Sequence, residues 1–176
     1  MTIKNMSGVF IFYGNNVLML KRTKKDFNGE GQYYSIGGKF ENEDLNSPTK
    51  CILRELNEET GLKEDDISNL QLKYIVYRNR GDIITQNYLF FAELKKMKEL
   101  TSCNEGILEW VPIEEVFNKP QPESSLSCLN HYFNGGKDIN TITVAVGTNV
   151  NGYGEYFFTD LVPFEEMNNS DNNKKK

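Results

Sequence analysis

Residues 47–62, "SPTKCILRELNEETGL", decide the fold because they specify one helix together with both of its ends. Ser47 can cap the free backbone N–H groups of a helix start. Pro48 suits the first helical position, where a backbone N–H would have no partner. Gly61 is typical of the residue that ends a helix. The stretch therefore predicts a helix over about 48–60, with an apolar side for packing on a sheet.

The polar side of this helix carries a group of carboxylates. Glu55, Glu58 and Glu59 are spaced i, i+3 and i+4, so their side chains project together. Like charges at this spacing repel, and Arg54, four residues before Glu58, offsets only part of the repulsion. Carboxylate oxygens are the ligands of hard divalent cations such as Mg²⁺ or Mn²⁺, which share their remaining positions with substrate phosphates. A solvated acidic face is the alternative interpretation of the cluster.

The rest of the chain predicts strands on both sides of this helix. Three pairs of apolar or β-branched segments are joined by turn sequences and predict hairpins: 7–13 with 16–22, 70–78 with 84–94, and 141–146 with 155–161. A further strand is expected at 33–38, and segment 108–119 predicts a short strand that turns at Pro112 into a helix. A last helix is expected over 124–136. This order predicts an α/β layered domain.

Composition limits the possible functions. The 176 residues, 38% of them hydrophobic, predict one soluble domain over 1–165 and a disordered polar tail over 166–176. The net charge of −5 argues against a general binder of nucleic-acid polymers or membrane surfaces. With no leader sequence and no apolar run of about 18 residues, we expect a cytoplasmic protein.

Covalent chemistry is not predicted by the nucleophilic residues. Cys51, Cys103 and Cys128 are widely spaced without a CxxC, so buried free thiols are expected in place of a disulfide framework or zinc site. His131 is the only histidine, and we expect it to be a structural helix residue. A water molecule activated by a divalent cation, with a carboxylate taking its proton, is then the expected nucleophile.

Residues 37–62, "GGKFENEDLNSPTKCILRELNEETGL", resemble the Nudix box: glycine, five residues, glutamate, seven residues, then R-E-apolar-x-E-E-x-G-apolar. The second half matches at every specified position. The first half departs from the pattern, because Gly38 and Arg54 are separated by two extra residues. Counting back from Arg54 places Asn46 where glutamate is expected. If the extra residues lie in "NEDL", Asn46 replaces that glutamate, and Asp44 or Glu43 serves in its place.

The resemblance covers roughly residues 5–162 and extends to the Gram-positive MutT-type 8-oxo-dGTP diphosphatases of the Nudix hydrolase superfamily. It implies an α/β/α sandwich with a mixed β-sheet and a catalytic loop-helix-loop. It also implies a set of site residues. The implied catalytic residues are Arg54, Glu55, Glu58, Glu59 and Glu105. The implied ligands of Mg²⁺, or of Mn²⁺, are Gly37, Glu55, Glu58, Glu59 and Glu105. The implied substrate-binding residues are Arg22, Gly38, Lys39 and Glu123.

The resemblance further implies hydrolysis of a nucleoside triphosphate to a nucleoside monophosphate and pyrophosphate, with 8-oxo-dGTP as the leading substrate. Another nucleoside diphosphate derivative remains open as substrate, and Phe27, Tyr33 or Tyr34 could stack on its base. Two non-catalytic alternatives also remain: a nucleotide-sensing module of the same fold, and an acidic helix that only docks a protein partner. Both a monomer and a homodimer are compatible with the sequence.

Overall fold

The computed structural model describes residues 1–23, 29–101, 104–150 and 153–163. The expected roles of Phe27 and Cys103, and the predicted tail over 166–176, lie outside the described residues. Cys51 and Cys128 are buried free thiols, as predicted. Among the described helices, none has the length and apolar character needed to cross a bilayer.

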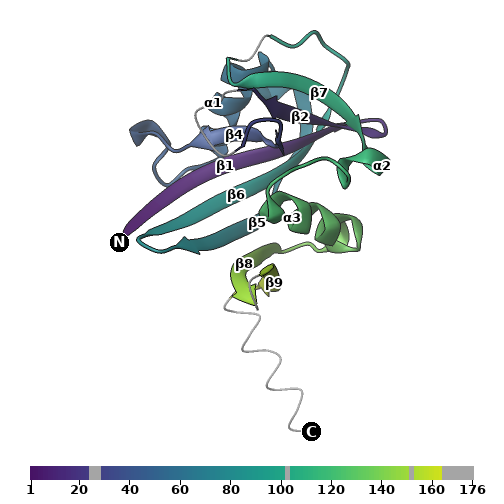
Figure 1. The fold of residues 1–176 in the computed structure, drawn as a ribbon. Coiled ribbons are helices and arrows are strands. Elements are labelled where there is room, and N and C mark those ends of the chain that lie inside the picture. The colour runs from purple at the N-terminus through teal and green to yellow at the C-terminus, as the bar shows by residue number, and fades with distance from the viewer. Residues whose placement is uncertain (24–28, 102–103, 151–152, 164–176) are drawn as a thin grey trace, which may run out of the picture.

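Nine strands of the described residues form one mixed sheet (Figure 1). Its main path runs in the order β3-β2-β1-β6-β5-β8-β9, while β4 also pairs with β1 and β7 also pairs with β2. The pairs β1–β6 and β5–β8 are parallel, and the other pairs are antiparallel. The strands are β1 (Thr2–Tyr13), β2 (Asn16–Arg22), β3 (Tyr33–Tyr34), β4 (Ile36–Lys39), β5 (Ile67–Arg80), β6 (Ile83–Leu94), β7 (Gly106–Pro112), β8 (Ile142–Val150) and β9 (Tyr153–Leu161).

The three predicted hairpins are confirmed as β1–β2, β5–β6 and β8–β9. The stretch 33–38, predicted as one strand, is two strands with different neighbours. Tyr33 and Tyr34 pair with β2, whereas the strand from Ile36 pairs with β1. The prediction of a single strand was wrong because the choice of neighbour is set by distant residues and leaves no local signal.

The helix predicted from residues 47–62 is confirmed as α1 (Pro48–Thr60). Ser47 Oγ accepts a hydrogen bond from the Lys50 N–H at 3.3 Å, and Gly61 ends the helix with a φ of 74°. The other helices are α2 (Ile113–Val116) and α3 (Glu123–Phe133), and short 3₁₀ turns are η1 (Asn42–Asp44), η2 (Glu64–Asp66) and η3 (Gly136–Asp138). The capping chemistry of the sequence is therefore sufficient to fix both ends of α1.

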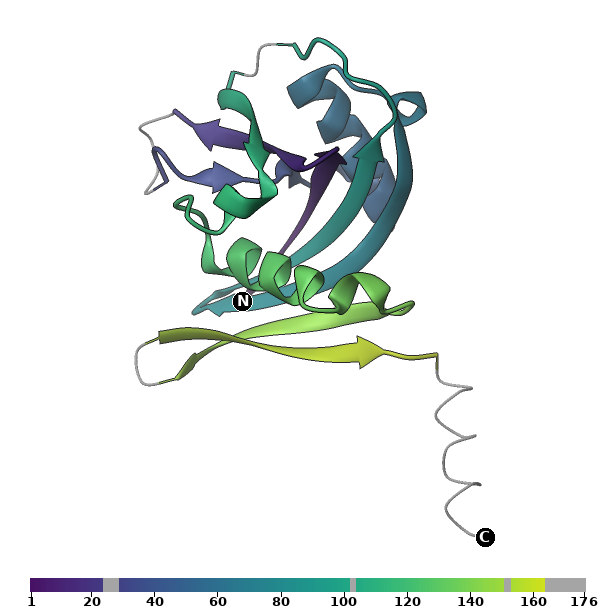
Figure 2. The same ribbon diagram turned by 90° about the vertical axis from the view of Figure 1, so that its right-hand side faces the viewer.

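Helices α1 and α3 cover opposite faces of the sheet (Figures 1 and 2), which we call the α1 face and the α3 face. Side chains alternate between the faces along each strand. On β1, Val9 and Ile11 pack with Leu56 of α1, whereas Phe10 packs with Leu129 of α3. The α/β/α sandwich predicted from the sequence is confirmed, and this alternation shows which face each polar side chain reaches.

Candidate active site

Arg54 is the centre of a charged network on α1. Its Nη1 lies 3.0 Å from Glu55 Oε1 and 3.0 Å from Glu58 Oε2, and its Nη2 lies 2.7 Å from Asp44 Oδ2. The same Nη2 donates to the carbonyl oxygen of Lys39 at the end of β4, at 3.0 Å. One guanidinium therefore fixes two helix carboxylates, the turn before the helix and the strand before that turn.

Asp44, in η1, is the buried partner of Arg54. It is fully buried, and its Oδ2 also accepts a hydrogen bond from the Glu41 N–H at 3.0 Å. The hydrogen bonds from Arg54 hold the pKa of Asp44 below its usual range, even though burial acts in the opposite direction. Asp44 is therefore an ionised, buried partner that fixes the position of the Arg54 guanidinium.

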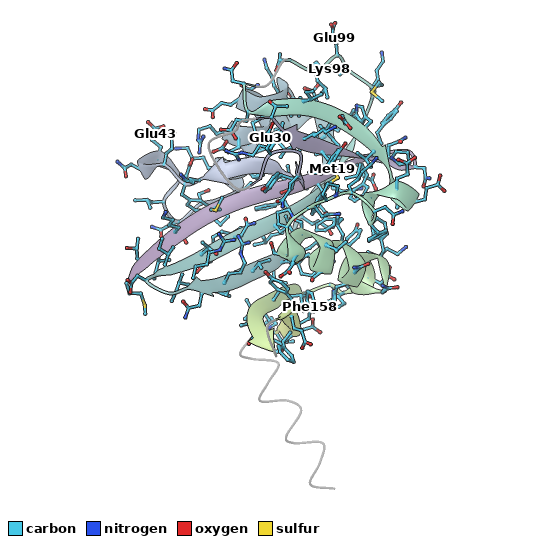
Figure 3. The ribbon with its side chains drawn as sticks, viewed as in Figure 1. Met19, Glu30, Glu43, Lys98, Glu99 and Phe158 are labelled. Carbon is cyan, nitrogen blue, oxygen red and sulfur yellow. The ribbon has the colours of Figure 1, made fainter. Side chains whose placement is uncertain are left out.

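The position of Asp44 resolves the irregular first half of the sequence motif. Gly38 is followed by five residues and then by Asp44, so the spacing from the glycine is that of the Nudix box, with aspartate in place of glutamate. The two extra residues follow Asp44. Asn46, predicted as the replacement, lies instead in the connection to α1 with a φ of 66°. Glu43, the other alternative, is exposed at the rim of the molecule (Figure 3).

Glu59 faces the sheet near the end of α1. It is 7% exposed, and its Oε2 accepts a hydrogen bond from the Gly37 N–H at 2.9 Å. Burial raises the pKa of Glu59 to about 7, opposed by the bond from Gly37 and reinforced by nearby negative charges. These charges belong to Glu55, Glu105 and Glu58. Burial also raises the pKa of Glu55, against the influence of Arg54. The carboxylates therefore repel one another in the absence of a cation.

The glycine pair of β4 lets the helix carboxylates approach the strand. A Cβ on Gly38 would lie 2.3 Å from Glu55 Oε1, so any side chain there would displace that carboxylate. Gly37 has a φ of 146°, and a Cβ there would lie 2.1 Å from the Ser7 carbonyl oxygen. The backbone therefore requires glycine at position 37, whereas a side chain at position 38 would require the Glu55 carboxylate to move.

Arg22 and Glu105 lie across from α1. Arg22 ends β2, and its alternation with Leu18 and Leu20 places it on the α1 face. Its Nη1 lies 3.8 Å from Glu105 Oε2, just before β7. The charge of Glu105 also raises the pKa of Glu59. The structure therefore brings both predicted residues to the same face as the helix carboxylates.

Lys39 and Glu123 are not gathered with that group. Because Gly38 faces Glu55, alternation places the exposed side chain of the next residue, Lys39, on the α3 face. Glu123 is the first residue of α3, and a Cβ on Gly154 of β9 would lie 2.0 Å from its Oε2. The substrate-binding roles of these two residues remain predictions.

His131 lies in α3, away from the helix carboxylates. Its Nδ1 is 2.9 Å from the Tyr74 hydroxyl oxygen, and its ring stacks on Phe158 with centroids 4.3 Å apart. Burial lowers the pKa of His131. These contacts agree with the structural role predicted for the only histidine.

The carboxylates of α1 suit a divalent cation in chemical type. Within the described residues, however, no three His, Cys, Asp or Glu side chains stand close enough together to ligate one metal ion. Glu55 and Glu58 are drawn to Arg54, and Glu59 is turned to Gly37. The metal-ligand roles of these carboxylates, of Glu105 and of Gly37 therefore remain predictions.

Asp44 was one of two residues that the sequence offered in place of the motif glutamate, but it was not among the implied site residues. Counting back from Arg54 points to Asn46, whereas counting forward from Gly38 points to Asp44. The forward count is the better signal because η1 continues directly from β4. The loop that absorbs the extra residues comes later, between Asp44 and α1.

Comparisons with known proteins agree with this geometry. The family model of the NUDIX domain matches residues 4–130. A mutator MutT protein from Bacillus halodurans superimposes with a TM-score of 0.65 at 21% identity, covering 88% of this chain and 97% of that protein. An Ap4A hydrolase from C. elegans gives 0.63 at 12%, covering 77% and 99%. An ADP-ribose pyrophosphatase from Streptococcus suis gives 0.55 at 15%, covering 81% and 98%.

The structural likenesses, at these identities, show the fold alone. The family match spans most of the chain and includes both β4 and α1. Nudix hydrolases act on phosphoric anhydride bonds of nucleoside diphosphate derivatives and generally use divalent metal ions. The chain therefore belongs to the Nudix family and is a Nudix hydrolase.

Proposed function

We propose that the protein is a Mg²⁺-dependent nucleoside triphosphate pyrophosphohydrolase that releases a nucleoside monophosphate and pyrophosphate, with 8-oxo-dGTP as its leading substrate. The observation that carries the proposal is the Arg54 network. Arg54 contacts Glu55 and Glu58. Glu55 lies against Gly38, and Glu59 accepts a hydrogen bond from the Gly37 N–H, at the face that Arg22 and Glu105 also reach. Mn²⁺ is an alternative cation, and a cytoplasmic location follows from the sequence prediction.

In this proposal Glu55, Glu58 and Glu59 hold the cation, with Glu105 and the carbonyl oxygen of Gly37 as further ligands. When bound, the cation neutralises phosphate charge and activates the attacking water. Arg54 is a positioning residue, because it acts through the carboxylates that it contacts. In the same proposal, Arg22 donates hydrogen bonds to substrate phosphate oxygens.

The test measures phosphate and pyrophosphate release with Mg²⁺ across a panel. The panel contains 8-oxo-dGTP, dGTP, the other ordinary nucleoside triphosphates, ADP-ribose and a dinucleoside polyphosphate. Glu58→Gln is expected to lower kcat by about two to four orders of magnitude, because a neutral amide binds a cation weakly and cannot accept a proton as a carboxylate does. Glu64→Gln is the matched control, since Glu64 is an exposed acid just beyond the helix.

Pyrophosphate release from 8-oxo-dGTP well above that from dGTP would support the leading substrate. Equal cleavage of the two would mean that the enzyme does not select 8-oxo-dGTP and that its preferred substrate is another compound. Full activity of Glu58→Gln would contradict the role of the helix carboxylates. If no compound of the panel were hydrolysed, a nucleotide-sensing module would be favoured. Another nucleoside diphosphate derivative is the alternative substrate class, and cleavage of ADP-ribose or the dinucleoside polyphosphate in the panel would support it.

A further inference from the structure

Strand β9 is a long and regular edge of the sheet. It is the last strand in the order of the main path, and among the described strands it pairs only with β8. In Figure 2 it is the yellow strand that runs along the lower margin of the sheet, below α3. β8 and β9 pair at nine successive positions without a register shift. The backbone N–H and C=O groups on the outer side of β9 therefore have no neighbouring strand in the described part of the chain.

Apolar side chains are exposed next to this edge. Phe157, at the middle of β9, is 60% exposed, and its pair on β8, Val146, is 44% exposed. Leu161, at the end of β9, is 49% exposed. Because Phe158 packs in the α3 core, alternation places these three side chains on the other face of the hairpin, where the cluster around α1 includes no described residue of β8 or β9. We call Val146, Phe157 and Leu161 the β8–β9 apolar strip.

β9 lacks the features that usually keep edge strands apart, which are lysine, proline, a bulge or a short length. Its nine residues, "YGEYFFTDL", contain no lysine and no proline. The other free strand, β7, shows the contrast, because it has seven residues, ends in Pro112 and has Glu109 at its centre. Two copies of β7 paired about that centre would place two carboxylates opposite each other. The centre of β9 is the apolar Phe157.

The residue order of β9 is compatible with pairing to itself. A two-fold axis perpendicular to the sheet through Phe157 makes two copies of the strand antiparallel, keeps their faces matched and uses all nine residues. Phe157 then faces Phe157 of the second copy on the strip side. Tyr156 faces Phe158 on the α3 side. Aromatic pairs of this kind stabilise neighbouring strands.

The acidic residues of β9 do not face each other in this register. Glu155 faces Thr159 of the second copy, whose hydroxyl can donate to the carboxylate. Asp160 faces Gly154, and within its own chain its Oδ1 accepts a hydrogen bond from Thr143 Oγ1 at 3.3 Å. An axis at Glu155 or at Asp160 would instead bring two carboxylates together and shorten the ladder. The register centred on Phe157 is therefore the favoured one.

The size of this contact predicts a weak dimer. Nine extended residues span about 30 Å, and a sheet with its side chains is about 10 Å thick, so the edge buries roughly 300 Å² on each copy. A stable complex of standard size buries about 800 Å² on each partner. We therefore expect a dissociation constant of about 10 to 100 μM.

We propose that β9 is a dimerisation edge, at which a second copy of this chain adds its own β9 antiparallel about Phe157 and extends the sheet across both copies. The partner is a second copy because the same strand supplies the aromatic pairs and the hydroxyl that each edge needs. β1, on which β4 and α1 pack, lies four strands from β9, or about 19 Å. Both candidate active sites stay open in this dimer, so the inference does not depend on the proposed function.

Sedimentation velocity of the full chain in low-salt buffer tests the proposal, over concentrations from about 5 to about 300 μM. The wild type should pass from monomer to dimer across this range. Phe157→Lys should raise the dissociation constant at least about tenfold, because two like charges then face each other at the axis. Ile107→Lys is the matched control, since it adds the same charge at an apolar residue of β7 that is 53% exposed, and it should dimerise like the wild type.

A second variant tests the register through a gain of affinity, which misfolding cannot imitate. Thr159→Lys places an ammonium group opposite Glu155 of the second copy. The two symmetric pairs of opposite charge should lower the dissociation constant about threefold to tenfold. Thr148→Lys is its control, because Thr148 is the neighbour of Glu155 within one chain, and it should not strengthen the dimer.

Several results would overturn the proposal. One is a wild type that stays monomeric up to about 300 μM. If that monomer formed dimers once residues 164–176 were removed, the tail of the same chain would be the occupant of the edge. Dimers that persist in Phe157→Lys, or that are lost equally in Ile107→Lys, would place the contact elsewhere. A Thr159→Lys variant that binds no more tightly than the wild type would contradict the register centred on Phe157.

Discussion

Arg54 and Arg78 are two arginines on opposite faces of one sheet, and their surroundings are opposite as well. Arg54 contacts carboxylates of Asp44, Glu55 and Glu58, whereas Arg78 has no acidic partner among the described residues. The first arginine is balanced within the fold and fixes the positions of other groups. The second has a buried Nε atom without a hydrogen-bond partner in the described part of the chain. The comparison predicts that the paired arginine supports the fold and that the unpaired one does not.

The largest expected effect on stability is at Asp44. Asp44→Ala removes the buried partner of Arg54 and should lower the free energy of unfolding by about 3 kcal/mol, because one charge of a buried pair is left uncompensated. Urea unfolding measures the change. Glu43→Gln, an exposed acid in the same turn, should change stability by less than about 0.5 kcal/mol. A loss at Glu43 equal to that at Asp44 would contradict the assignment of the partner.

The same pair should give the fold a dependence on acid. The folded pKa of Asp44 is lowered, so its contribution to stability is present above the unfolded value of about 4 and is lost as pH falls through the folded value. The difference in unfolding free energy between the wild type and Asp44→Asn should therefore shrink below about pH 4. Urea titrations at a series of pH values test this. A difference that stays constant from pH 7 to pH 3 would mean that Asp44 is not held ionised by Arg54.

The smallest expected effect is at Arg78, and its sign separates the two arginines. Arg78→Met removes an unpaired, half-buried charge and keeps an apolar chain of similar length. The melting temperature should stay the same or rise slightly, with a change in unfolding free energy below about 1 kcal/mol. Thermal unfolding without ligand measures it. A clear loss of stability would show that Arg78 supports the fold and would remove the contrast with Arg54.

The sequence predicted those parts of the molecule that depend on neighbours along the chain. Ser47, Pro48 and Gly61 define α1 because capping needs only residues within one turn. The hairpins were predicted for the same reason. Glu55, Glu58 and Glu59 were grouped by helical spacing together with a family motif. Two of them, Glu55 and Glu59, lie against the glycine pair noted in the sequence.

The sequence did not predict features that depend on pairing between distant segments. The sequence left Asp44 and Glu43 as alternatives for the missing glutamate, and the hydrogen bond from Arg54 to Asp44 decides between them. The surroundings of Arg78 depend on the pairing of β5 with both β6 and β8, and on which face α3 covers. A polar residue at an inward position of a strand is a usable signal for a half-buried polar group. It becomes specific only when the register is known.

The parallel pairing of β1 with β6 affects how the protein forms during synthesis. β1 ends at Tyr13 and β6 begins at Ile83, so the ribosome releases the first strand long before its neighbour at the middle of the sheet. Until then, β1 has only β2 and the short β4 as strand neighbours and α1 on one face, while its α3 face has no helix to cover it. Pairings this distant slow folding and lengthen the exposure of nascent strands. The Nudix motif on β4 and α1 is thus translated before the sheet that positions it can close.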